Sequence, residues 1–138
     1  MAAFNKINQL VADMANKVHN LGSDDLRIYL SNTAATAGST VYNTPADLST
    51  SGGYTAGGAT CAITSSTQTG GLYKLILVGP SWTATTGFGP FEFAILYNNT
   101  AASKQLIGYW DYGSSLTVAA SATFSITLDA ANGTVEIQ

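Results

Sequence analysis

The side chains best suited to acid–base chemistry in this 138-residue chain are two carboxylates, Glu92 and Asp111. We expect their two segments to pair as a β-hairpin, which would place the carboxyl groups across from each other. Facing carboxyl groups are the arrangement that glycoside hydrolysis uses. The simpler interpretation is that both are charges on exposed strand faces. We therefore expect no enzymatic activity, and a Glu92 and Asp111 site is the enzymatic alternative.

Few other groups in the chain are suited to chemistry. His19 is the only histidine, and it lies near the end of a predicted helix, where interaction with the helix dipole explains it better than catalysis does. Cys61 is the only cysteine, which excludes an intramolecular disulfide and a multi-cysteine metal site. We expect Cys61 to be a small buried residue. The sequence thus predicts no catalytic residue, no metal and no cofactor.

Four aromatic residues of the same predicted hairpin suggest a different class of function. They are Tyr97, Tyr109, Trp110 and Tyr112. Exposed aromatic rings on neighbouring strands can form a platform for a sugar or a base. Aromatic residues on paired strands also fill cores. A carbohydrate-binding or receptor-binding β module is therefore an alternative to a purely structural role.

The N-terminal segment 4–21 is the only part of the chain with a clear helical period. Its apolar residues recur at steps of three and four, which places them on one stripe of an α-helix. These residues are Phe4, Ile7, Val11, Met14 and Val18. Such a stripe needs a partner, either the chain's own β domain or a neighbouring subunit. In both cases we expect this packing surface to fix how copies of the domain meet.

The rest of the chain, 23–138, has the pattern of short strands and turns. In its clearest strand, Phe91, Phe93, Ile95 and Tyr97 alternate with other residues, and 106–113 is the predicted hairpin partner. Asn132-Gly133 predicts a second hairpin, between 124–128 and 135–137.

These elements predict a mainly β fold. We expect an antiparallel β-sandwich or barrel of about seven to nine short strands with one N-terminal amphipathic α-helix. The length fits a single domain over 1–138, with the helix in 1–22 and the β domain in 23–138.

The composition narrows the choice of partners. Charged residues make up 9% of the chain, against the usual quarter, and the formal net charge is −3. So few charges favour a chain that buries most of its surface in contacts with other protein chains. A stable β protein with a neutral, hydroxyl-rich surface is the alternative. Scattered positive charges argue against nucleic acid. No stretch resembles a membrane span or a secretion signal, so we expect no membrane partner and synthesis in a cytoplasm.

Five segments, in the same order along most of the chain, carry a family resemblance. They are FNKINQLVADMANKVHNLGSDDLRIYLSNTA, GGYTAGGAT, TGGLYKLILV, GPFEFAILYNNT and LIGYWDYGSS. They resemble small structural proteins encoded in the virion gene blocks of tailed bacteriophages. The resemblance implies membership of a phage particle and transfers no catalytic residue.

From the resemblance and the composition together we expect a non-enzymatic structural protein, most simply a capsid decoration or cement protein acting as a symmetric oligomer. Its partners would be further copies of itself and other virion proteins, and it would be located in the virion after assembly in the host cytoplasm. A tail, neck or fibre component and a self-assembling tube or coat subunit are the close alternatives.

Overall fold

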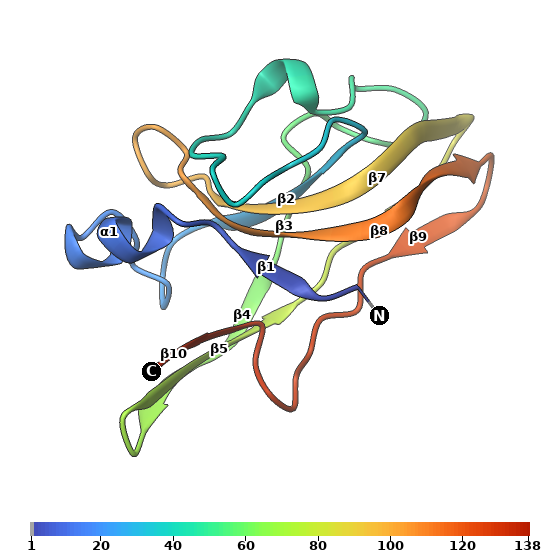
Figure 1. Ribbon diagram of the computed structural model, residues 1–138. Coiled ribbons are helices and arrows are strands. Elements are labelled where there is room, and N and C mark those ends of the chain that lie inside the picture. The colour runs from blue at the N-terminus through green and yellow to red at the C-terminus, as the bar shows by residue number, and fades with distance from the viewer. Residues whose placement is uncertain (1) are drawn as a thin grey trace.

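The computed structural model describes residues 2–138, in which ten strands form antiparallel sheets (Figure 1). One sheet has five strands in the order β1-β8-β7-β2-β3, a second has the order β10-β5-β4, and β6 pairs with β9. The strands are β1 (Phe4–Lys6), β2 (Leu26–Ser31), β3 (Ala59–Thr60), β4 (Ala62–Thr69), β5 (Leu72–Val78), β6 (Ser81–Thr83), β7 (Gly87–Asn98), β8 (Leu106–Ala119), β9 (Thr123–Ser125) and β10 (Val135–Ile137). The prediction of a mainly β, antiparallel fold is confirmed, with slightly more strands than predicted.

The predicted helix over 4–21 is wrong. Its first residues form β1, which pairs with β8 through Asn5 and Tyr109, and the helix α1 covers only Leu10–Ala15. The Phe4 ring covers Gly108 of β8 so closely that a Cβ atom there would lie 2.2 Å from the ring. The helix cannot continue because Lys17 has a φ of 61°, in the left-handed region. The predicted helical unit 1–22 is therefore wrong over its described residues, 2–22, since β1 belongs to the five-stranded sheet.

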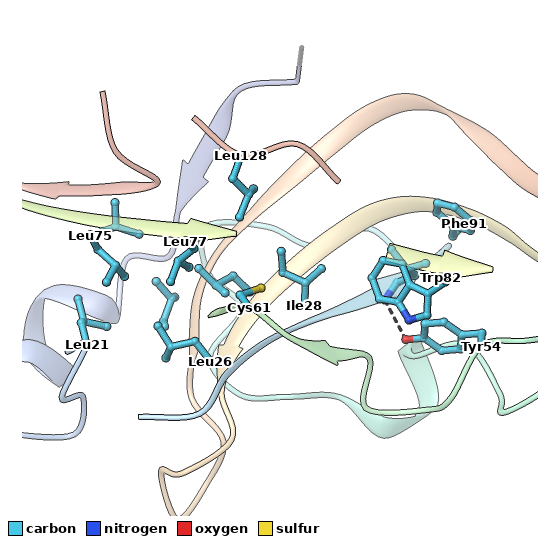
Figure 2. Packing of buried hydrophobic residues seen from close by; sticks show 14 of the residues in the cluster. Leu21, Leu26, Ile28, Tyr54, Cys61, Leu75, Leu77, Trp82, Phe91 and Leu128 are labelled. Atoms are coloured by element: carbon cyan, nitrogen blue, oxygen red, sulfur yellow. Dashed lines mark hydrogen bonds between the residues drawn. The ribbon is translucent and has the colours of Figure 1, made fainter. Parts of the chain in front are cut away.

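The main core lies between the five-stranded and three-stranded sheets. Leu26 and Ile28 of β2 belong to the same buried cluster as Leu75 and Leu77 of β5, as Figure 2 shows. Cys61 is a buried free thiol in this cluster, as predicted, and burial raises its pKa to about 12. It is therefore an unreactive packing residue.

The outer face of the five-stranded sheet is also covered. Tyr29, Ile95 and Tyr97 form a second buried cluster there, and Tyr42 from the long segment between β2 and β3 packs against it. That segment is irregular apart from the 3-10 helix η1 (Thr44–Ala46). The central strand β2 and the adjoining part of β7 are therefore buried on both faces, whereas much of β8 is exposed.

The predicted aromatic face of β7 is divided between these two clusters. Phe93, Ile95 and Tyr97 belong to the outer cluster, whereas Phe91 lies in the main core. The register of β7 against β8 shifts between Phe91 and Phe93, where residues 112–115 of β8 lie opposite Glu92 alone. The regular pairing of the two strands is interrupted there, and simple alternation does not foresee such an irregularity.

The predicted hairpin at Asn132-Gly133 is also wrong. β9 pairs with β6, and β10 pairs with β5, so the two segments that flank the turn belong to different sheets. The Asp129 carboxylate accepts hydrogen bonds from the backbone N–H groups of Ala131 and Asn132, which stabilises the turn locally. The turn therefore carries the chain from one sheet to another.

Candidate functional site

The two larger sheets are connected at one side and separate at the other. β3 leads through Cys61 directly into β4, so the backbone joins the two sheet edges there. On the opposite side the edge strands are β1 and β10, which lie near the two ends of the chain (Figure 1). Two clefts lie along this open side, and they share Phe4, Gly133 and Thr134.

The first, which we name the terminal cleft, lies between α1 and β10 and has a volume of ≈ 600 Å³. Leu10, Val11 and Met14 line it from the helix, and Val135 and Ile137 line it from β10. Both walls of this cleft are therefore apolar.

The terminal cleft also exposes apolar surface and carries balanced charge. Val11 is 62% exposed and Ile137 is 36% exposed, so two of the large apolar side chains on the described surface belong to it. Lys6 and Glu136 are the only charged residues among its described lining, and they lie on opposite walls. An apolar, overall neutral surface of this kind is typical of a protein contact.

The second, which we name the aromatic cleft, has a volume of ≈ 590 Å³. Phe4, Trp110 and Tyr112 line one wall, and Phe124 and Leu128 line the other. The rings of Phe4 and Trp110 pack with their centroids 5.2 Å apart, whereas Tyr112 is 62% exposed at the bulge of β8. The cleft has the size and the aromatic lining of a ligand pocket.

The four aromatic residues predicted to form one platform do not lie together. Trp110 and Tyr112 share the aromatic cleft, but Tyr97 and Tyr109 belong to the outer cluster on the opposite face of the sheet. Tyr97 is only 1% exposed, and its hydroxyl donates a hydrogen bond to the Gly57 carbonyl over 2.7 Å. Phe4, which reaches the aromatic cleft from the distant strand β1, was not among the residues predicted for the platform.

The predicted apolar stripe is likewise divided, because its residues are not on one helix. Phe4 and Met14 pack against the main core, and Ile7 is fully buried in the outer cluster. Val18 lies beyond the end of α1 and is half-buried. Val11 is thus the only residue of the stripe whose side chain is mostly exposed.

The two candidate catalytic carboxylates do come together. Partial burial, followed by the negative charge of Asp111 and a hydrogen bond with it, raises the pKa of Glu92. Glu92 lines the aromatic cleft, and Asp111 of β8 pairs with the next residue of β7, Phe93. The two acidic side chains therefore lie beside each other at the rim of this cleft.

His19 lies beyond α1, in a buried polar cluster, so the predicted interaction with a helix end is wrong. The side-chain oxygen of Asn98 accepts hydrogen bonds from two backbone N–H groups of the following turn. Its side-chain nitrogen therefore points the other way, and lies 3.0 Å from His19 Nδ1 and 2.6 Å from Asp24 Oδ2. His19 Nδ1 must then accept a hydrogen bond from the Asn98 side-chain nitrogen, so the proton of the neutral imidazole ring is on Nε2. That atom lies 3.8 Å from Asp13 Oδ2, and neither atom has a hydrogen-bond partner.

This cluster predicts a loss of stability in mild acid. Burial lowers the pKa of His19 below its usual 6.5, although Asp13 and Asp24 oppose the shift. The unfolded chain then binds more protons than the folded chain below pH 6.5, so the free energy of unfolding should fall as the pH decreases from about 6.5 to 5. Urea titrations across this range should show a smaller fall for His19→Gln. A wild-type chain that gains stability on acidification would contradict this prediction.

Other classes of site find no support among residues 2–138. No group of three or more potential metal ligands occurs there. None of the described helices has the length and apolar character needed to cross a membrane. In comparisons with known proteins, no family model, no curated protein and no solved structure matches the chain.

Proposed function

We propose that this chain is a non-enzymatic structural protein of a tailed-phage particle, a capsid decoration or cement protein that works as a symmetric oligomer. We further infer that its two larger sheets form a β-sandwich open on one side. The segment resemblance supports the particle role, and the terminal cleft is the observation that supports self-assembly. Tail, neck and fibre components and tube or coat subunits assemble by the same kind of contact and are the alternatives.

A second copy of the chain is the occupant that best fits the terminal cleft. In a two-fold contact, each residue on one wall meets a residue from the other wall of the second copy. Lys6 would then lie near the Glu136 of the second copy, and the reverse, so the contact is complementary in charge. The exposed Val11 and Ile137 side chains would be buried at the same time.

Replacing Val11 with aspartate should convert the oligomer into a folded monomer. Val11 is 62% exposed on α1, so the isolated chain tolerates the charge, whereas a symmetric contact would bury it twice. We expect association to weaken by about 1,000-fold, because about 2 kcal/mol is lost for each of the two copies. Light scattering coupled to gel filtration would measure the mass, and circular dichroism would check the fold.

Val78→Asp is the matched control. Val78 is 52% exposed at the end of β5, outside both clefts, and its variant should keep the wild-type mass. An unchanged mass for Val11→Asp, or equal loss of association in both variants, would overturn the terminal cleft as the assembly surface.

The particle role is tested on purified virions. Mass spectrometry should detect the chain in particles after gradient purification, and electron microscopy should place it on the outside of the shell. Absence from the purified particles would contradict the particle role, and a position in the tail or tube would favour the alternatives over decoration.

A further inference from the structure

The aromatic cleft is distinct from the terminal cleft in its charge. Among its described lining residues, only Glu92 and Asp129 are charged, and both are acidic. No lysine or arginine of the described chain lines it. The terminal cleft, in contrast, has one charge of each sign. The two clefts therefore suit occupants of different chemistry.

In the described chain, no cation lies beside Glu92, although Lys74 acts on Asp129. The Asp129 carboxylate is already engaged in its own turn, because its two oxygens accept hydrogen bonds from the backbone N–H of Ala131 and from the backbone and side chain of Asn132. Glu92 is next to a second acid, Asp111, and no salt bridge involves either residue in the described chain. A cation brought to this rim would relieve the repulsion between the two carboxyl groups.

The apolar part of the cleft favours a cation that is attached to an apolar group. The faces of Trp110 and Tyr112 attract an ammonium or guanidinium group through the ring quadrupole, and Phe124 and Leu128 offer an apolar surface opposite. Beside them, β1 is an edge strand of the five-stranded sheet, and an extended segment can add to such an edge.

The chain itself is a poor source for this cation. Four of its five positive side chains already have a partner or lie in the terminal cleft. Arg27 forms a salt bridge with Asp25, and Lys74 forms one with Glu136. Lys104 lies over the ring of Tyr42, and Lys6 lines the terminal cleft. The remaining one, Lys17, is in the left-handed turn after α1. A different protein is the better source.

We propose that the aromatic cleft binds an extended segment of a second protein that carries a lysine or arginine between apolar residues. The cation lies over Trp110 and Tyr112 beside Glu92, and the neighbouring apolar side chains lie against Phe124 and Leu128. In a particle, this contact would join the chain to a protein other than itself. The side chains that contact the segment do not line the terminal cleft, although the two clefts adjoin at Phe4, so each contact can fail without the other.

The test uses the full chain and two acetylated, amidated pentapeptides, Ala-Leu-Lys-Leu-Ala and Ala-Leu-Glu-Leu-Ala, with maltoheptaose as a sugar probe. Nuclear magnetic resonance titration should show shifts at the Trp110 indole and at the Tyr112 amide with the lysine peptide only. Binding should weaken about fivefold in Glu92→Gln, since one favourable charge contact is lost. Glu136→Gln removes a charge outside the aromatic cleft, and when it is introduced into the monomeric Val11→Asp variant it should bind the peptide as strongly as that variant does.

Three results would overturn the proposal: no shifts with the lysine peptide, equal binding of the glutamate peptide, or unchanged affinity in Glu92→Gln. Shifts with maltoheptaose alone would assign the cleft to a carbohydrate instead. The titration is repeated on Val11→Asp. Peptide binding by that monomer separates this inference from the proposed self-assembly, because either property can then be lost while the other is kept.

Discussion

Replacing Gly58 with alanine is expected to lower the free energy of unfolding by about 4 kcal/mol or more, enough to unfold a marginally stable domain. Gly58 has a φ of +72°, and a Cβ atom there would lie 1.8 Å from the carbonyl oxygen of Ile28. It would also lie 2.7 Å from the Cα atom of Tyr29, so backbone atoms would have to move. The next residue, Ala59, pairs with Ile28, and the substitution should therefore separate β3 from β2.

Gly71→Ala is the control that separates the steric effect from the conformational one. Gly71 has a φ of +87°, but no atom lies within 4 Å of the position of its Cβ atom. We expect this variant to lose only about 1 kcal/mol, the cost of a left-handed conformation. Urea unfolding of both variants measures the difference. Equal losses would show that the close approach to Ile28 contributes nothing.

The sequence predicted the parts of the fold that depend on neighbouring residues. The hairpin of β7 and β8 follows from local alternation, and its observed pairing of Ile95 with Tyr109 lies within the predicted segments. The alternation of Leu26, Ile28 and Leu30 is likewise typical of a strand, and these residues of β2 face the main core, although the opposite face of β2 is buried as well. In both cases the pattern of a strand is complete within about eight residues, so no distant contact is needed to recognise it.

The failures occurred where a distant contact decides the structure. Phe4 fits a helical period as well as a strand, and what decides between them is Gly108 of β8, about a hundred positions later, which its ring covers. Asn132-Gly133 fits a hairpin, but the stronger partner of Val135 is Leu75 in another sheet. Local periodicity contains no information about such partners.

The clefts were beyond prediction for the same reason. They form because β1 and β10 belong to different sheets, and because Tyr112, at the bulge of β8, is exposed beside the same cleft as Trp110. Of the residues predicted for an interface, Val11 keeps that role in the proposal, now for its exposure rather than for its place on a long helix.

Replacing Asp47 with alanine is the other change from which we expect a large effect, a loss of about 3 kcal/mol. Its carboxylate accepts hydrogen bonds from the hydroxyl groups of Tyr42, over 2.7 Å, and Tyr54, over 2.5 Å, and from the backbone N–H of Gly57, over 2.5 Å. The buried Tyr54 hydroxyl in turn accepts a hydrogen bond from the N–H of Leu30. Without the carboxylate, buried donors lose their acceptor, which costs about 1 to 3 kcal/mol for each group before relaxation.

Tyr42→Phe removes only one of these three hydrogen bonds and keeps the ring stacked on Tyr97, so we expect a loss of about 1 kcal/mol. Urea unfolding compares the two variants, and hydrogen exchange should show faster opening of residues 40–58 in Asp47→Ala. A loss no greater than that of Tyr42→Phe would mean that the carboxylate does not hold this segment on the sheet. Because the segment covers the outer face, away from the open side, the folded Asp47→Ala chain should keep the wild-type oligomeric mass. Separate responses of stability and assembly would show that the two faces of the five-stranded sheet have different roles.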